Sequence, residues 1–194
     1  MGKGRLEAFS DGVMAIIITI MVLEIHVPSG TDWSALGPLV PVLLSYVLSF
    51  VFLGIYWNNH HHLMHAVRYV NGRILWANLH LLFWLSLTPF VTGWMGESRF
   101  ATRPVAAYGF VQLASAVAYF ILTRTLIAHH GHDSTLAAAL GSDFKGKISV
   151  ALYVAAIPLA FVAAPLACAI YVAVAIIWLV PDPRLERALA GRSA

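Results

Sequence analysis

The chain has 194 residues, of which 60% are hydrophobic and only 11% are charged. A soluble domain is about half apolar and a quarter charged, so this composition indicates a membrane protein and excludes an ordinary soluble domain. The formal net charge of +3 is spread between apolar segments, which suits membrane topology and excludes a nucleic-acid surface. The single cysteine, Cys168, excludes an intrachain disulfide.

Apolar segments long enough to cross a hydrocarbon core of about 30 Å recur along the chain. They predict an all-α membrane protein with six transmembrane helices, at residues 5–26, 35–65, 72–95, 104–129, 146–163 and 165–180. Pro158 and Pro165 interrupt an almost continuous apolar run, so five helices with a kink is the competing count. We expect residues 1–180 to form one domain and residues 181–194 to form a mobile cytoplasmic tail.

The twelve Lys and Arg residues distinguish between these two counts. With six crossings, ten of them share the side that holds both termini, and only Arg99 and Arg103 lie on the other side. With five crossings, the three C-terminal arginines would move to the far side. The positive-inside rule therefore favours six helices with both termini in the cytoplasm.

The first apolar segment has charged residues at both ends and an uncharged middle of twelve residues, 12–23. At 1.5 Å per residue this middle covers roughly 18 Å, less than the hydrocarbon thickness. A lipid-facing helix would leave Asp11 or Glu24 near acyl chains, so we expect this helix inside the bundle, shielded by the other five. A cleaved secretory signal is disfavoured, because Glu7 and Asp11 interrupt the segment and no small-residue cleavage site follows.

Within this segment, Ile16, Ile20 and Leu23 lie at i, i+4 and i+7 and form one stripe, with Thr19 beside it. Spacing alone favours ordinary helix packing for such a stripe. The same pattern can also form a hydrophobic constriction that gates a pore by dewetting.

Residues 5–11 read RLEAFSD, which matches the pattern Arg-x-x-x-Phe-Ser-Asp. This pattern resembles the signature of the endosomal and lysosomal potassium channel family (transmembrane protein 175 type). The segments WNNHH at 57–61, NL at 78–79 and LTPF at 87–90 are also family-like and follow in the same order. The resemblance covers most of the chain, and prokaryotic members of the family have a single six-helix unit of this size.

The resemblance implies a homotetramer in which helix 1 of each subunit lines a central pore. In the family, the narrowest point is a ring of large aliphatic side chains five residues after the motif aspartate, which here is Ile16. The next pore-lining layers would be Thr19, Ile20 and Leu23. Glu24 would attract cations at the external mouth. Like the family, the sequence lacks the Thr-Val-Gly-Tyr-Gly filter, and the resemblance implies the family's modest selectivity for potassium over sodium.

In this family the motif is buried near the cytoplasmic end and ties helix 1 to helices 2 and 3. The resemblance therefore implies that polar side chains of helix 1 bond with one of two adjacent histidines and with an asparagine. The network would consist of Arg5, Phe9, Ser10, Asp11, His60, His61 and Asn78.

Two clusters of histidines raise the alternative of a metal site. His61 and His65 lie at i, i+4 and could share one metal ion, but a zinc site needs three or four ligands. A second cluster consists of His129, His130, His132 and Asp133. No HExxH pattern is present, so we expect neither a metal site nor a cofactor.

An enzyme is not expected, because the sequence has no nucleophile elbow, phosphate loop or dinucleotide fingerprint. The family resemblance instead implies a passive potassium channel in the plasma membrane of a prokaryote, with potassium ions and the lipid bilayer as its partners. Two alternatives stay open. One is a proton- or ion-coupled secondary transporter that uses Asp11 and His60, and the other is a non-conducting membrane scaffold.

Overall fold

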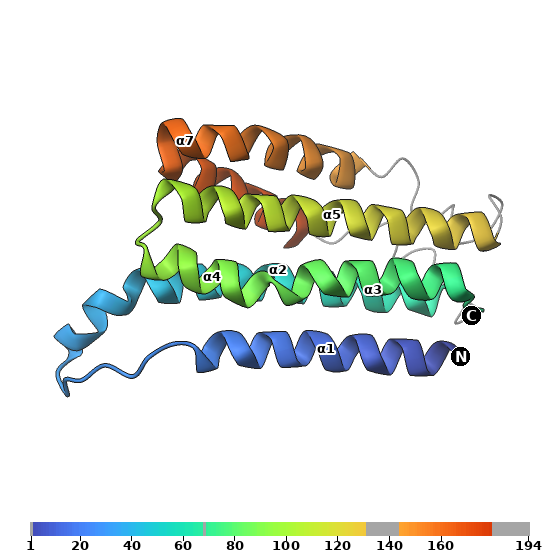
Figure 1. Cartoon of the computed structure of the whole chain (residues 1–194), viewed down its shortest axis with the longest axis horizontal. Helices are drawn as coiled ribbons and strands as arrows, with labels where there is room; N and C mark the ends of the chain where they lie inside the picture. The colour runs from blue at the N-terminus through green and yellow to red at the C-terminus, as the bar shows by residue number, and fades with distance from the viewer. Residues whose placement is uncertain (1, 68, 131–143, 180–194) are drawn as a thin grey trace.

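The computed structural model describes residues 2–67, 69–130 and 144–179, and all regular structure in these residues is helical. The elements are α1 (Lys3–Leu23), the 3-10 helix η1 (Trp33–Leu39), α2 (Val40–His65), α3 (Gly72–Ser86), α4 (Thr88–Glu97), α5 (Thr102–His130) and α7 (Phe144–Leu179). They form an elongated bundle with α1 along one edge and α7 along the opposite edge (Figure 1). The all-α prediction is confirmed.

Prolines break two of the predicted helices. The second predicted helix begins as the separate turn η1, because Pro38 and Pro41 supply no backbone N–H to an α-helical ladder. The third is interrupted at Leu87, two residues before Pro89, and continues as α4. At its start, α3 is capped by Asn71, whose side-chain oxygen accepts the backbone N–H of Ile74 at 3.0 Å.

The long helix α7 is a hairpin of two helices. Ala163, two residues before Pro165, has φ −153° and ψ 86°, which interrupts the helix. The indole N–H of Trp178 donates to the hydroxyl of Ser149 at 2.8 Å, across 29 positions of sequence. A straight helix would separate these residues by roughly 43 Å, so the chain reverses direction near Ala163.

Five helical stretches of the described residues are long and apolar enough to cross a membrane. Because the last stretch is the α7 hairpin, the described residues provide six segments that can cross a membrane, as predicted, and a continuous, merely kinked fifth helix is wrong. The proposed tail, residues 181–194, lies outside the described residues.

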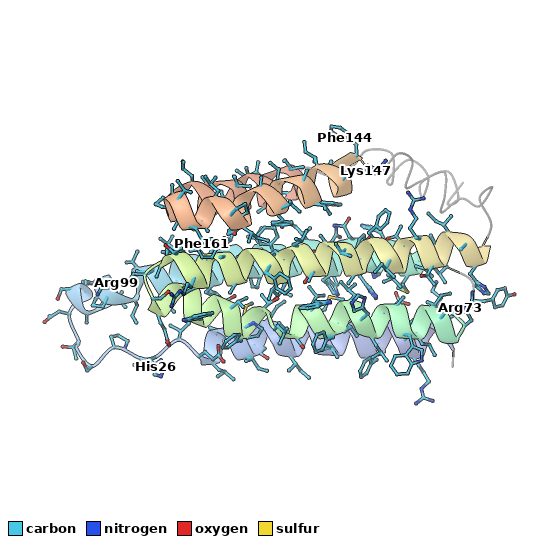
Figure 2. All side chains as sticks on the ribbon, turned by 45° about the horizontal axis from the view of Figure 1, so that its top comes forward. His26, Arg73, Arg99, Phe144, Lys147 and Phe161 are labelled. Carbon is cyan, nitrogen blue, oxygen red and sulfur yellow. The ribbon has the colours of Figure 1, made fainter. Side chains whose placement is uncertain are left out.

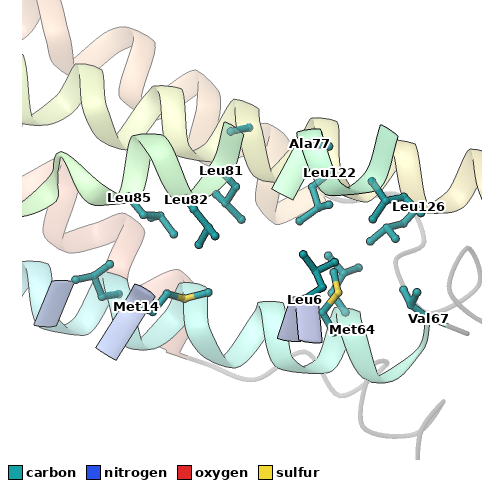
Figure 3. Close-up of a cluster of buried hydrophobic side chains, with 14 of the residues drawn as sticks. Leu6, Met14, Met64, Val67, Ala77, Leu81, Leu82, Leu85, Leu122 and Leu126 are labelled. Atoms are coloured by element: carbon teal, nitrogen blue, oxygen red, sulfur yellow. The ribbon is translucent and has the colours of Figure 1, made fainter. Parts of the chain in front are cut away.

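Two groups of buried side chains hold the bundle together. The first joins α1, α2, α3 and α5. In Figure 3, Met14 of α1 lies on the side of Leu82 and Leu85 of α3, and Leu6 lies beside Met64 of α2. The second joins α2, α4, α5 and α7 and is rich in aromatic and small residues; its aromatic members are Phe52, Tyr108, Tyr153 and Tyr171.

The two ends of the bundle differ in their number of basic residues. At the basic end, α1, α3 and α7 begin and α2 and α5 end, and its described cations are Lys3, Arg5, Arg73, Arg124, Lys145 and Lys147. The opposite end carries Arg99 and Arg103. Figure 2 shows Arg73 and Lys147 toward one end and Arg99 at the other. The remaining four Lys and Arg residues lie outside the described residues.

Candidate pore helix and its motif network

One face of α1 packs against the bundle. Its buried residues recur every three or four positions and so form a single stripe: Leu6, Ser10, Met14, Ile17 and Met21. The stripe contacts mainly α2, α3 and α4. The prediction that the other five helices shield α1 is wrong for a single chain, because α1 lies at the edge of the bundle (Figure 1).

The opposite face of α1 is open. It carries the four residues predicted to line a pore, and Ile16, Ile20 and Leu23 are 58%, 40% and 81% exposed. Thr19 is also exposed, and its hydroxyl donates to the carbonyl of Ile16 at 2.9 Å. Because its hydrogen is used in this way, the Thr19 oxygen presents only its acceptor lone pairs to the open face. The predicted stripe is therefore not packed against the rest of its own chain.

A buried chain of hydrogen bonds joins α1 to α3 and α2. Ser10, Asn78 and His60 are each 0% exposed. The Asn78 amide donates to Ser10 Oγ at 2.9 Å, and Ser10 Oγ donates to the carbonyl of Leu6 at 2.9 Å. On the other side of Asn78, its Oδ1 lies 2.8 Å from His60 Nε2. Three of the predicted network residues are thus brought together.

The direction of these bonds determines where His60 carries a proton. The Ser10 hydroxyl donates its only hydrogen to the Leu6 carbonyl. Ser10 Oγ can therefore only accept from Asn78, so Asn78 must turn its NH₂ group toward Ser10. The Asn78 oxygen then faces His60 and can only accept, so His60 Nε2 must be the donor. His60 Nδ1 is buried and has no hydrogen-bond partner among the described residues. A neutral His60 is therefore the Nε2–H tautomer.

A second set of contacts joins α1 to α2 at the protein surface. The indole of Trp57 donates to Asp11 Oδ1 at 3.1 Å, and His61 Nδ1 lies 3.7 Å from Glu7 Oε1, an ion pair when His61 is protonated. The Lys3 ammonium donates to the carbonyl of His65 at 3.4 Å. Each helix contributes every fourth residue, as expected for antiparallel neighbours. We call these three contacts the outer ladder.

Some predicted network residues have other positions than expected. Asp11 bonds to Trp57 rather than to a histidine or to Asn78, because it lies outside the buried stripe of α1. Arg5 is exposed, and the buried bonds form without it. Phe9 is 49% exposed and belongs to the open side of the helix.

Sequence reasoning missed the outer ladder. Lys3, Glu7 and Asp11 are spaced at i, i+4 and i+8, and the same spacing recurs in residues 57, 61 and 65. Two polar stripes of this spacing on consecutive helices could have predicted a ladder of contacts between them.

The opposite end of α1 faces a depression that is lined in part by charged residues. Glu24 is exposed, and its carboxylate lies against Gly93 of α4. A cavity of about 230 Å³ beside it is lined by Glu24, His26, Glu97 and Arg99, among others. The carboxylate predicted to attract cations therefore stands beside a second carboxylate and one arginine.

The histidine clusters give no metal site among the described residues. No group of three or more His, Cys, Asp or Glu side chains is placed there to hold a metal ion. The rings of His61 and His65 are 5.9 Å apart, and His129 bonds to Asn71 at 3.1 Å. The side chain of His130, together with His132 and Asp133, lies outside the described residues.

Six apolar crossings and a polar network that fixes an edge helix define a polytopic α-helical membrane protein. The family described as endosomal/lysosomal potassium channel TMEM175 matches residues 5–89. A relative from Chryseobacterium sp. (strain P1-3), named a potassium channel, is 56% identical over 189 residues, which cover 97% of this chain and 98% of the relative. The chain therefore belongs to the TMEM175 potassium channel family.

Two further comparisons agree with this membership. A relative from Streptomyces collinus (strain DSM 40733 / Tue 365), also named a potassium channel, is 35% identical over 203 residues, which cover 96% of this chain and 97% of the relative. The crystal structure of a lysosomal potassium-selective channel TMEM175 homolog from Chamaesiphon minutus matches with a TM-score of 0.79 at 29% identity. That match covers 92% of this chain and 96% of the solved chain.

Proposed function

We propose that this protein is a passive potassium channel, in which four copies of the chain place α1 around a central pore. The open face of α1 carries this proposal. Its apolar side chains are exposed along a helix whose other face is fixed by buried packing and hydrogen bonds. The relatives with high coverage are named potassium channels, which supports the same function.

The charges at the ends of α1 favour a pore over a lipid contact for this face. Asp11 and Glu24 flank an apolar middle that is shorter than the hydrocarbon core. Carboxylates at such positions are costly against acyl chains and tolerated beside water. A central, water-filled axis would supply that water at both ends of the helix.

Ile16 would form the constriction. It is the first large aliphatic residue on the open face after the motif, and four copies would form an apolar ring. Rings of this kind limit conduction by dewetting. One turn further along, the Thr19 residues of the four copies would offer four hydroxyl oxygens as acceptors for a partly dehydrated cation. Ile20 and Leu23 would line the next layers of the pore.

The membrane orientation follows from charge. The basic end would lie in the cytoplasm, together with both termini, and Glu24 would lie at the external mouth of the pore. There its carboxylate, with Glu97 nearby, would raise the local cation concentration. The proposed location is the plasma membrane of a prokaryote, because the Chryseobacterium and Streptomyces relatives, which match over nearly their whole length, are bacterial.

The test is flux of potassium and of sodium from liposomes that contain purified protein. Wild type should conduct potassium faster than sodium, with flux that does not saturate and does not depend on a proton gradient. Ile16→Asn should raise the flux severalfold and bring the two ion fluxes closer together, because a polar ring wets more readily. Light scattering of the detergent-solubilised protein should give the mass of four chains.

A matched control separates the pore from the lipid-facing surface. Val154 on α7 is 54% exposed, close to the exposure of Ile16, but lies on the other side of the bundle. Val154→Asn should leave ion selectivity unchanged. Saturable, proton-coupled flux would instead support a transporter, and a folded protein without flux in any variant would support a scaffold.

A further inference from the structure

A cavity of about 310 Å³ lies between α2, α5 and α7, and no residue of α1 lines it. Its size falls within the range of pockets that hold small molecules. Most of its lining is apolar or aromatic, including Phe52, Tyr56, Val117, Val150, Tyr153 and Trp178. An apolar space of this size is a poor site for water.

The cavity opens at the outer surface of the chain. Two of its lining residues, Val117 and Phe120 on α5, are each 39% exposed. On the first arm of α7, the lining runs from Gly146 to Tyr153, which are separated by roughly 10 Å along the helix. It therefore extends from the level of Lys147 toward the middle of the bundle, in the direction that an acyl chain takes in a leaflet.

Positive charge gathers where the cavity approaches the basic end. Lys147, which is labelled in Figure 2, is one of the lining residues. The guanidinium of Arg124 lies 4.9 Å from the ring centroid of Phe120, another lining residue. Neither α5 nor α7 contains an Asp or Glu within its described residues. An anion at this position would meet two cations from adjacent helices and no carboxylate from either.

Several polar side chains of the lining are already hydrogen-bonded within the protein. The Asn59 amide donates to the carbonyl of Ile55 at 2.8 Å. Ser149 donates to the carbonyl of Lys145 and accepts from Trp178, each at 2.8 Å. The interior of the cavity therefore suits an aliphatic chain better than a polar ligand.

We propose that this cavity takes one acyl chain of an anionic phospholipid, whose phosphate lies between Lys147 and Arg124. The lipid comes from the leaflet at the basic end of the bundle. Lys147 and Arg124 select the negative headgroup, and the aromatic and aliphatic walls hold the chain. The site lies apart from the face of α1, so its occupancy is measured without reference to conduction.

The experiment is native mass spectrometry of full-length protein exchanged into vesicles with equal amounts of phosphatidylglycerol and phosphatidylcholine of the same acyl chains. Wild type should retain one phosphatidylglycerol per chain in preference to phosphatidylcholine. Lys147→Gln should reduce this preference about fivefold, the effect of one cation near an anionic membrane surface. Lys145→Gln, two positions away and outside the lining, should leave the preference unchanged.

A second pair of variants tests the cavity itself. Val150→Phe fills part of it and should abolish retention, whereas Val154→Phe adds the same bulk one turn away on an exposed surface and should not. Equal retention of both lipids by wild type would overturn the proposal. So would an equal loss from Lys147→Gln and Lys145→Gln, because surface charge alone would then explain the preference.

Discussion

The two edges of the bundle are held by different kinds of contact. At the α1 edge, a narrow apolar stripe is supplemented by the buried Ser10–Asn78–His60 chain and by the outer ladder. At the α5–α7 edge, contacts are largely apolar, and packing is close around Gly109. There Tyr171 lies directly over Gly109, and its hydroxyl donates to the carbonyl of Val105 at 3.0 Å.

This difference in contacts indicates that α1 and the α5–α7 edge have different structural roles. Hydrogen bonds have direction, so a few of them can fix the rotation of α1 about its axis while its other face stays open. Apolar packing has no such direction and gains by covering as much surface as possible. The α5–α7 edge is therefore suited to stability, and the α1 edge to holding one face of a helix in place.

The largest expected effect is at the buried chain. Asn78→Leu should lower the free energy of unfolding by about 3 kcal/mol, because His60 would lose its acceptor in a buried position. Thermal unfolding in detergent, compared with wild type, measures this effect. The double variant His60→Leu, Asn78→Leu should lose less than the sum of the two single variants, because no buried donor is then left without an acceptor. Additive losses would show that the bond between them is unimportant.

The next effect is at the α5–α7 edge. Gly109→Ala should cost about 2 kcal/mol, because the new Cβ would collide with the Tyr171 hydroxyl and approach Ile157 Cγ1 to 3.2 Å. Ion flux per folded protein should stay at the wild-type level. Gly54→Ala is the matched control, because a Cβ added there would have nothing within 4 Å. Alanine has a better helix propensity than glycine, so this variant should raise the free energy of unfolding by up to about 1 kcal/mol. Similar unfolding temperatures for the two variants would argue against close packing at Gly109.

The smallest effect is at the outer ladder. Trp57→Phe removes the hydrogen bond to Asp11 but keeps an aromatic ring near His61, so the loss should be about 0.5–1 kcal/mol. Thermal unfolding of both variants shows whether Trp57→Phe loses less stability than Asn78→Leu. A loss as large as that of Asn78→Leu would mean that the surface ladder, and not the buried chain, holds α1.

Several features were predictable from sequence because local chemistry sets them. Prolines mark the breaks before α2, after α3 and within α7, although the sequence analysis located only the break in α7. Ser10, His60 and Asn78 were expected to meet only through the family resemblance, and the structure brings them together. The choice of Trp57 as the partner of Asp11 was not predictable, because it depends on the register of α1 against α2.

By itself, the sequence determined that this is an all-α membrane protein with six crossings and a basic end, because hydropathy, proline positions and charge act locally along the chain. Only the tertiary structure decided that α1 lies at an edge with Ile16 on its open face, and that α7 folds back to place Trp178 beside Ser149. The physical reason is that an apolar stripe has the same pattern whether it faces another helix, lipid or water. Its environment is fixed only when the neighbouring helices take their places.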